Sequence, residues 1–496
     1  MKRIVSRLNA EDSRHGIAAL IRARAAVIFL AFSLTTCAAA STVPHFGGTL
    51  RVEMSERIAT IDPRQWPPVP AQAAAVERLD TLVFDRLVRL DEHGMPQSAL
   101  AISWTHDPQS KRWQFRLRDG VKFSDGTLLT PTIAALALQQ LLGTSYDVSA
   151  TSESIVIQCE HPLPGLLSEL ATGRYFVFHT REDNSLTGTG PFHVAEWPTE
   201  SGAAQAVFVA NDTSWAGRPF IDKIEIVMGV DFQQQANAIS FGQADVVELP
   251  ASQVRRASQR GVRTVSSDPV ELFALVFDSS RPAVQDARLR QAISLSIDRS
   301  SIADVILQKQ GIAAGGLLPN WISGYAHLFP VSADLARAKD LLAASGREHS
   351  HSMPLVLFYD SSDAEARAVA DRVAVNLREV GIMVQVSGQF SDVKKKPVAA
   401  DMRLVRHRID APDPAQALAE LLNSLGEAGA ELDSPEQIYA AERAPIDAFR
   451  VIPLVHISES YGLSPQVRDW MAPRWGGWRL EDVWLAPLTP AGGNSP

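Results

Sequence analysis

The residue types that most often carry out catalysis form no recognisable catalytic pattern in this sequence. There is no GxSxG elbow, HExxH pair, phosphate-binding glycine loop or paired CxxC. Gly188–Gly190 begins like a dinucleotide-binding loop, but Pro191 and Phe192 follow it instead of a helix-opening pattern. His349 and His351 form a close pair in a polar stretch, and no metal-ligating partners are identified for them. The pattern predicts no catalytic residues, no cofactor and no metal, with a secreted hydrolase as an alternative.

The first forty residues predict a secretory signal peptide. A basic region precedes the apolar run Ala25–Leu34, and Ala38–Ala40 then supplies small residues for cleavage. The apolar run is shorter than the roughly 20 residues of a membrane-spanning helix. A buried N-terminal helix is the alternative. The basic residues are Lys2, Arg3, Arg7, Arg14, Arg22 and Arg24. We therefore expect residues 1–40 to be removed and the mature chain to lie outside the cytoplasm.

The two cysteines leave a second question open. Cleavage after Ala40 would leave Cys159 alone, so no intrachain disulfide would form. Leu34–Cys37 resembles a bacterial lipoprotein box, in which Cys37 becomes lipidated, although Thr36 replaces the usual smaller residue. Lipid anchoring at Cys37 and cleavage after Ala40 are the two alternatives.

Length and charge restrict the class of protein. The 496 residues are enough for two or three packed cores. The formal net charge is −9, and the first forty residues carry six basic and two acidic residues, which leaves −13 on the remainder. Phosphate binding depends on clustered lysine and arginine, so we expect no nucleic-acid partner. Lys394–Lys396 is interpreted as a solvated loop.

A β-α-β run is the clearest structural signal. Residues 355–359 predict a strand, 364–380 a helix with apolar residues at helical spacing, and 382–386 a returning strand. This alternation predicts an α/β fold with a mainly parallel sheet covered by helices. Residues 402–409 predict another strand of the same body. Further expected elements are strands at 49–54 and 113–117, and helices at 73–90, 131–142 (capped by Thr130) and 288–297.

Several stretches, taken in order, resemble the extracytoplasmic solute-binding proteins of bacterial ABC importers, family 5, of the oligopeptide-, dipeptide- and nickel-binding type. The strongest is Trp113–Thr127 (WQFRLRDGVKFSDGT), and Arg290–Arg299 (RQAISLSIDR) is nearly as specific. The others are Gly47–Val52, Asp85–Asp91, Ala99–Trp104, Thr187–Trp197, Asn211–Pro219, Gly242–Asp245, Asp334–Leu342 and Ile452–Leu454. The resemblance runs from about residue 47 to about residue 460.

The resemblance implies a bilobal periplasmic-binding-protein type II fold, with two α/β lobes and an extra subdomain in lobe I. Two segments, near Pro269–Phe273 and Ile452–Val455, would cross between the lobes. Ligand would lie in the cleft between the lobes, and hinge closure would shield it from water and strengthen charge contacts. The implied limits are 41–270 plus 457–496 for lobe I, about 64–185 for its subdomain, and 271–456 for lobe II.

The same resemblance implies a ligand site at the end of the strand predicted at 402–409. Asp410 resembles the aspartate with which peptide-binding members hold the α-ammonium group of a peptide, and a carboxylate in a closed cleft suits that group. Those members commonly carry Gly-Trp just before this aspartate, whereas this chain has Arg406 and His407. This departure favours an anionic or sugar-like ligand over a standard peptide. The alternative for Asp410 is the cap of a turn or helix, and Asp413-Pro414 is interpreted as a turn or helix start.

The implied function is capture of a peptide-like ligand and its delivery to the permease subunits of an ABC importer, without catalysis. We expect a periplasmic or extracytoplasmic monomer that meets the membrane only through the permease or through lipid on Cys37. A sensor or chaperone-like binder of the same fold is one alternative. A binder of oligosaccharide, nickel or haem is another.

Overall fold

The computed structural model describes residues 43–67, 70–198, 204–325, 328–345, 353–389, 399–427, 429, 432–475 and 477–487. The chain divides into two compact units, Met1–His45 and Phe46–Pro496, and the elements described below belong to the second. The predicted signal peptide with Cys37, the histidine pair at 349 and 351, and Lys394–Lys396 lie outside the described residues. No helix in the described ranges is both long and apolar enough to cross a bilayer.

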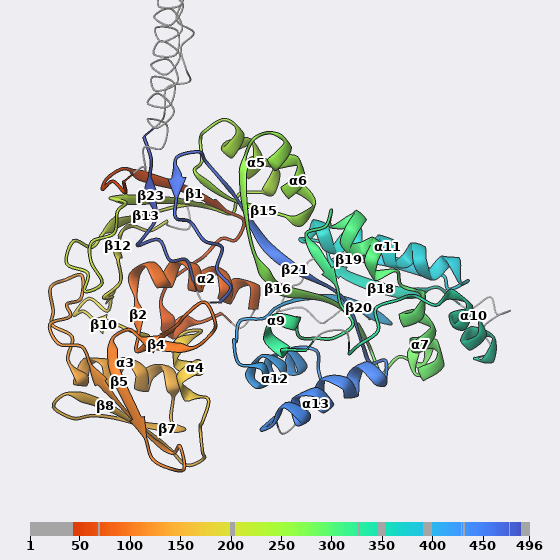
Figure 1. The fold of residues 1–496 in the computed structure, drawn as a ribbon, viewed down its shortest axis with the longest axis horizontal. Coiled ribbons are helices and arrows are strands. Elements are labelled where there is room, and N and C mark those ends of the chain that lie inside the picture. Colours follow the sequence, from red (N-terminus) through yellow and green to blue (C-terminus); the bar gives the residue numbers. More distant parts are fainter. Residues whose placement is uncertain are drawn as a thin grey trace, which may run out of the picture. The chain divides into compact units, whose positions relative to one another are not determined.

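A mixed sheet of eleven strands runs through the described part of the second unit (Figure 1). Its order is β12-β13-β14-β1-β15-β21-β16-β20-β18-β19, and β17 pairs with β21. The bounds are β1 Thr49–Met54, β12 Phe192–Glu196, β13 Gln205–Ala210, β14 Lys223–Met228, β15 Val246–Leu249, β16 Arg263–Phe277, β17 Gly311–Ala313, β18 Leu355–Asp360, β19 Val384–Gln389, β20 Met402–Arg408 and β21 Val451–Leu463. The expectation of a mainly parallel sheet is wrong, because among the described strands only β1 with β14 and β15, and β18 with β19 and β20, pair in parallel, and the other pairs are antiparallel. The α/β class is confirmed, because helices alternate with the strands and cover this mixed sheet.

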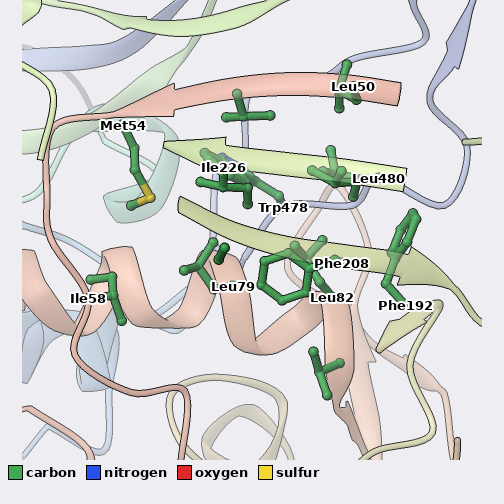
Figure 2. Close-up of a cluster of buried hydrophobic side chains, with 14 of the residues drawn as sticks. Leu50, Met54, Ile58, Leu79, Leu82, Phe192, Phe208, Ile226, Trp478 and Leu480 are labelled. Carbon is green, nitrogen blue, oxygen red and sulfur yellow. The ribbon is translucent and has the colours of Figure 1, made fainter. Parts of the chain in front are cut away.

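The first core lies between one end of this sheet and helix α2 (Pro70–Val83). The strand predicted at 49–54 is confirmed as β1, which buries every second side chain and pairs in parallel with β14. Leu50 of β1, Leu79 and Leu82 of α2, and Trp478 belong to one buried cluster, and Figure 2 shows Phe208 of β13 close to Leu82 within it. Helices α5 (Phe232–Ser240) and α6 (Ala251–Gln259) flank β15, and the short strands β22 (Val467–Arg468) and β23 (Trp484–Leu485) pair with each other.

The residues between α2 and β12 form a smaller antiparallel sheet with a buried cluster of its own, which we call the separate body, while Ala137, Leu141 and Phe178 pack into the first core. The sheet of the separate body has the order β5-β6-β8-β7, and its core holds Trp113, Phe115 and Leu138. Thr130 caps α3 by accepting a hydrogen bond from the backbone N–H of Ile133 at 3.3 Å, as the sequence predicts. The bounds are β2 Asp85–Arg86, β3 Val88–Leu90, β4 Pro96–Ser98, β5 Ala101–His106, β6 Arg112–Leu117, α3 Pro131–Leu142, β7 Tyr146–Ala150, β8 Ser154–Cys159, α4 Leu166–Ala171, β9 Phe176–Val177, β10 His179–Thr180 and β11 Leu186–Thr187. The limits expected for a subdomain, 64–185, stay a prediction.

The helix predicted at 73–90 is wrong beyond Val83. There α2 ends, and the chain continues as β2 and β3, which pair with β9 and β4. Leu87 and Val88 are fully buried in the core of the separate body, away from the first core that α2 covers. Burial in a second core therefore outweighs the helical periodicity that continues past Val83.

The second core surrounds the other end of the sheet. The predicted β-α-β run is confirmed: β18 and β19 pair in parallel, and α11 (Ala364–Glu379) connects them. Val369, Val373 and Leu377 are the fully buried face of α11. The other helices here are η3 Pro282–Val284, α7 Ala287–Ser296, α8 Arg299–Ser301, the π-helix η4 Ile302–Ile306, α9 Asn320–Ser323, α10 Leu335–Ala344, α12 Pro414–Ser424 and α13 Pro435–Asp447.

Two long antiparallel strands, β16 and β21, belong to both cores. They pair with each other from Arg263 opposite Leu463 to Val276 opposite Val451. β15 adds to β21 beside the first core, and β20 adds to β16 beside the second. The ladder between β16 and β21 shifts register on either side of Pro269, which lacks the N–H that a ladder requires. The lobe limits and crossing segments implied by the sequence stay predictions.

Candidate ligand-binding site

Two of the predicted site residues, Arg406 and His407, lie in the last part of strand β20, next to β16. Strand β20 pairs antiparallel with β16, so that Arg406 lies opposite Phe273 and Arg408 opposite Glu271. Side chains alternate along a strand, so Arg406 and Arg408 share one face and His407 lies on the other. Asp410 follows two residues after the strand ends.

Arg406 is surrounded by carboxylates. Its guanidinium donates to Glu271 at 2.5 Å, to Asp363 at 3.0 Å and to Glu365 at 3.2 Å. The side chain of Arg406 is 32% exposed; its partial desolvation lowers its pKa, but these carboxylates raise the pKa well above its ordinary value. The positive charge of Arg406 is thus matched within the protein, and little of it is free for an anionic ligand.

His407 contributes no positive charge at neutral pH. It lies opposite Leu272 of β16 and is partly buried. Burial lowers the pKa of His407 to about 4, because a desolvated imidazolium is disfavoured. The imidazole is therefore neutral unless the solution is acidic.

Asp410 is in contact with a cation of its own chain. Its Oδ1 forms an ion pair with Nη1 of Arg408, although neither atom has an aligned hydrogen bond. The side chain of Arg408 is 4% exposed and that of Asp410 is 29% exposed. Helix α12 is capped by Asp413, which accepts from the backbone N–H of Gln416 at 2.9 Å, and this confirms the predicted helix start. Asp410 is thus left to face Arg408.

The pair extends into a row of alternating charges, Glu248–Arg78–Glu459–Arg408–Asp410, which we call the ion-pair chain. Glu459 Oε1 accepts from Nε of Arg408 and from Nη2 of Arg78, both at 2.8 Å. Arg78 Nη1 donates to Glu248 at 2.5 Å. Burial by itself raises the pKa of Glu459, but the two guanidinium groups lower it to about 2. The ion-pair chain therefore joins α2 and β15 of the first core to β20, with Glu459 of β21 in between.

Near the ion-pair chain, α2 also holds a buried carboxyl group without a partner. Asp80 is fully buried, and its two oxygens accept no hydrogen bond from the described residues. Burial raises the pKa of Asp80 well above its ordinary value, by more than the nearby Arg86 lowers it. An unfolded carboxyl ionises near its ordinary pKa, so Asp80 costs stability as the pH rises from that value through the raised one.

We expect Asp80→Asn to reduce this loss of stability at higher pH. Urea unfolding at about pH 5 and about pH 8 should show a smaller fall in the free energy of unfolding for the variant than for the unchanged chain. Asp447→Asn, at an exposed position of α13, is the control and should keep the original pH dependence. Equal slopes in all three proteins would contradict the assignment.

The loop that follows Asp410 also makes a close contact with Gly94. A Cβ atom on Gly94 would lie 2.7 Å from Cβ of Pro412 and 3.2 Å from the ring of Trp475, so these groups already touch. The ring centroids of Trp475 and Trp321 are 5.4 Å apart, and the guanidinium of Arg474 lies 4.9 Å from the Trp321 ring. Gly94 thus touches both the loop that follows Asp410 and Trp475, and Trp321 packs against the cluster that holds Ile409 and Ala411.

Sequence reasoning did not identify Arg408, Arg78 or Glu459. For Arg408 a signal was present, because a residue two positions before Asp410 in extended backbone lies on the same face. Arg78 and Glu459 are 381 residues apart, and no local pattern connects them. The roles of Asp410, His407 and Arg406 as ligand contacts stay predictions.

Comparison with known proteins gives a consistent result. A family model for bacterial extracellular solute-binding proteins, family 5 (middle), matches residues 95–429. The nickel-binding periplasmic protein of Escherichia coli is 25% identical over 346 residues, covering 62% of this chain and 66% of that protein. The probable D,D-dipeptide-binding periplasmic protein DdpA of E. coli is 24% identical over 335 residues, covering 61% and 64%. The chain thus spans just under two thirds of these relatives. Heme-binding protein A of Haemophilus influenzae is 21% identical over 469 residues, covering 79% and 85%.

Solved structures support the same fold. NikA from Brucella suis, in complex with Fe(III)-EDTA, superposes with a TM-score of 0.76 at 18% identity and covers 88% of this chain and 100% of that one. The oligopeptide-binding protein AppA from Bacillus subtilis, in complex with a nonapeptide, gives 0.74 at 16% identity and covers 90% and 100%. The fold is therefore that of a bilobal periplasmic binding protein with a large mixed α/β sheet. Because the family model matches well over half of its residues, the chain belongs to the bacterial extracellular solute-binding proteins, family 5.

Proposed function

We propose that this chain captures a small solute outside the cytoplasm and delivers it to the permease of an ABC importer, without changing it chemically. The observation that carries the proposal is the family match over residues 95–429. The predicted signal peptide at 1–40 supports the location. Contact with the membrane would come through the permease, or through lipid if Cys37 is retained, and we propose that the chain acts as a monomer.

We further propose that the solute lies between lobe I (41–270 plus 457–496) and lobe II (271–456), beside Asp410. The paired strands β16 and β21 are the connection that would bend when the lobes close. Asp410, His407 and Arg406 would border the solute at the end of β20, where Asp410 is partly exposed.

A peptide-like solute is the best-supported class. The name of one relative states binding of a D,D-dipeptide, and one similar structure contains a nonapeptide. Arg406 is matched by Glu271, Asp363 and Glu365, so the site offers little free positive charge to a strongly anionic solute. Nickel and haem, named for other relatives, and oligosaccharide are the competing ligands.

Ligand binding is expected to change the intrinsic fluorescence of the ten tryptophans. Trp321 and Trp475 lie beside the loop after Asp410, so lobe closure would alter their surroundings. The titration would use a tripeptide library, oligosaccharides, nickel and haem as separate probes. Trp321→Phe should reduce the change, whereas Trp113→Phe, in the core of the separate body, should preserve it. No response to any class, with no heat in calorimetry, would contradict solute capture.

Native mass spectrometry of the chain purified from its own host would identify retained cargo. A host strain lacking the chain should then lose uptake of that compound. Retention of cargo with normal uptake in the strain would favour the sensor or chaperone-like binder. Genes for two permeases and two ATPases beside this one would favour transport.

A further inference from the structure

The internal partner of Asp410 has a consequence for which solutes the site can select. Arg408 is 4% exposed, and its Nε is already bonded to Glu459 at 2.8 Å, so this side chain is anchored within the protein. A second nitrogen of the same guanidinium, Nη1, forms the ion pair with Asp410. The carboxylate of Asp410 therefore has a cation beside it before any solute arrives.

A ligand ammonium at Asp410 would meet two obstacles. It would have to share the carboxylate with Arg408, and it would lie close to a second positive charge in a partly desolvated place, where charges interact strongly. If it took the carboxylate completely, Nη1 of Arg408 would remain buried without a partner, which is costly for a charged group. Arg408 cannot swing into solvent without breaking its bond to Glu459.

We propose that Arg408 is a specificity-determining residue. It acts as the internal counter-ion of Asp410, so the site accepts solutes with an acylated or uncharged amino end as readily as solutes with a free α-ammonium. This inference rests on the proposed capture of a peptide-like solute and names the chemical class within it. Without the guanidinium, Asp410 would offer an unshared carboxylate, and a charge-assisted hydrogen bond to a free amine would become available.

The test uses one randomised tripeptide library in two forms, with free amino ends and with N-acetylated ends, mixed in equal amounts. Native mass spectrometry measures the ratio of the two forms retained by the full chain. The unchanged protein should retain both within about threefold of each other. Arg408→Gln should shift the ratio at least about tenfold toward the free form, the low end of what a charge-assisted hydrogen bond contributes.

Two control variants separate specificity from damage to the fold. Arg443→Gln removes an exposed arginine of α13 and should leave the ratio unchanged. The double variant Arg408→Gln/Asp410→Asn should lose the preference for free amines that the single variant gained. If Arg408→Gln does not fold, as judged by circular dichroism, Asp410→Asn in the otherwise unchanged chain decides, and it should retain both forms within about threefold.

Three results would overturn the inference. They are a tenfold preference of the unchanged protein for free amines, an unaltered ratio in folded Arg408→Gln, and a tenfold loss of free peptides in Asp410→Asn. Failure of the proposed function looks different, because in that case neither library form would be retained by the unchanged protein, by Arg443→Gln or by Arg408→Gln.

Discussion

Replacing Glu459 by glutamine is expected to lower the free energy of unfolding by about 3–5 kcal/mol, the usual loss when one partner of a buried ion pair is removed. The side chain of Glu459 is 9% exposed, and it accepts from both Arg78 and Arg408. Glutamine keeps the shape but leaves two largely buried guanidinium groups facing a neutral amide. Denaturant unfolding at neutral pH would measure the difference.

The control for this prediction is a solvent-exposed ion pair of the same protein. Arg443 and Asp447 on α13 are 55% and 58% exposed, so Asp447→Asn should cost less than about 1 kcal/mol. A similarly small loss for Glu459→Gln would show that the ion-pair chain contributes little to the stability of the fold.

The same substitution should alter the acid sensitivity of the protein. The pKa of Glu459 is lowered to about 2 in the folded protein, from an ordinary value of 4.5. The stabilisation is therefore complete above the ordinary pKa and is lost as the pH falls from there toward about 2. The stability difference between the unchanged protein and Glu459→Gln should shrink over this interval, and a constant difference would contradict the assignment.

Gly188→Ala should destabilise the protein by about 3 kcal/mol or more, because the added methyl group would overpack a site that has no room to relax. A Cβ at Gly188 would lie 1.8 Å from the backbone oxygen of Val83, the last residue of α2. That oxygen already accepts from the backbone N–H of Gly190 at 2.9 Å, and the oxygen of Gly188 accepts from Ser124 at 2.9 Å. These two hydrogen bonds fix the backbone at Val83 and at Gly188, so neither segment can move away from the added methyl group.

A matched glycine is available as the control. Gly165, before α4, has a φ of −85°, and a Cβ there would meet no atom within 4 Å. Gly165→Ala should change the midpoint of urea unfolding very little. If Gly188→Ala unfolded at the same urea concentration as Gly165→Ala, the close packing against Val83 would be refuted.

Local patterns in the sequence predicted the elements that carry their own signal. The β-α-β run over 355–386 combines alternation with helical spacing, and the structure confirms it as β18, α11 and β19. Thr130 and Asp413 were predictable as helix starts because a capping side chain and a proline stand together. The α/β class followed from these elements without any knowledge of distant contacts.

Contacts between residues far apart in the sequence determined the features that local patterns did not predict. Residues 85–90 continue the periodicity of α2, yet they form β2 and β3, because Leu87 and Val88 are buried in the core of the separate body. The charge of Arg406 was visible, but its neutralisation by Asp363 and Glu365 depends on how α11 packs beside β20. The partner of Asp410 lay two residues away, whereas Glu459, which holds that partner, is 51 residues from it.

The composition of the first core affects the order in which the protein can mature. It joins Leu50 to Trp478 and Val483, so both extremes of the described chain must be present before it can close. Ribosomes deliver a polypeptide from its amino end, and domains usually condense in that order. Here the first core must wait for the segment with Trp478 and Val483 to emerge, while the second core, drawn from residues 251–457, can assemble sooner. A chain that still lacks the segment around Trp478 therefore leaves the part of this core around Leu50 open.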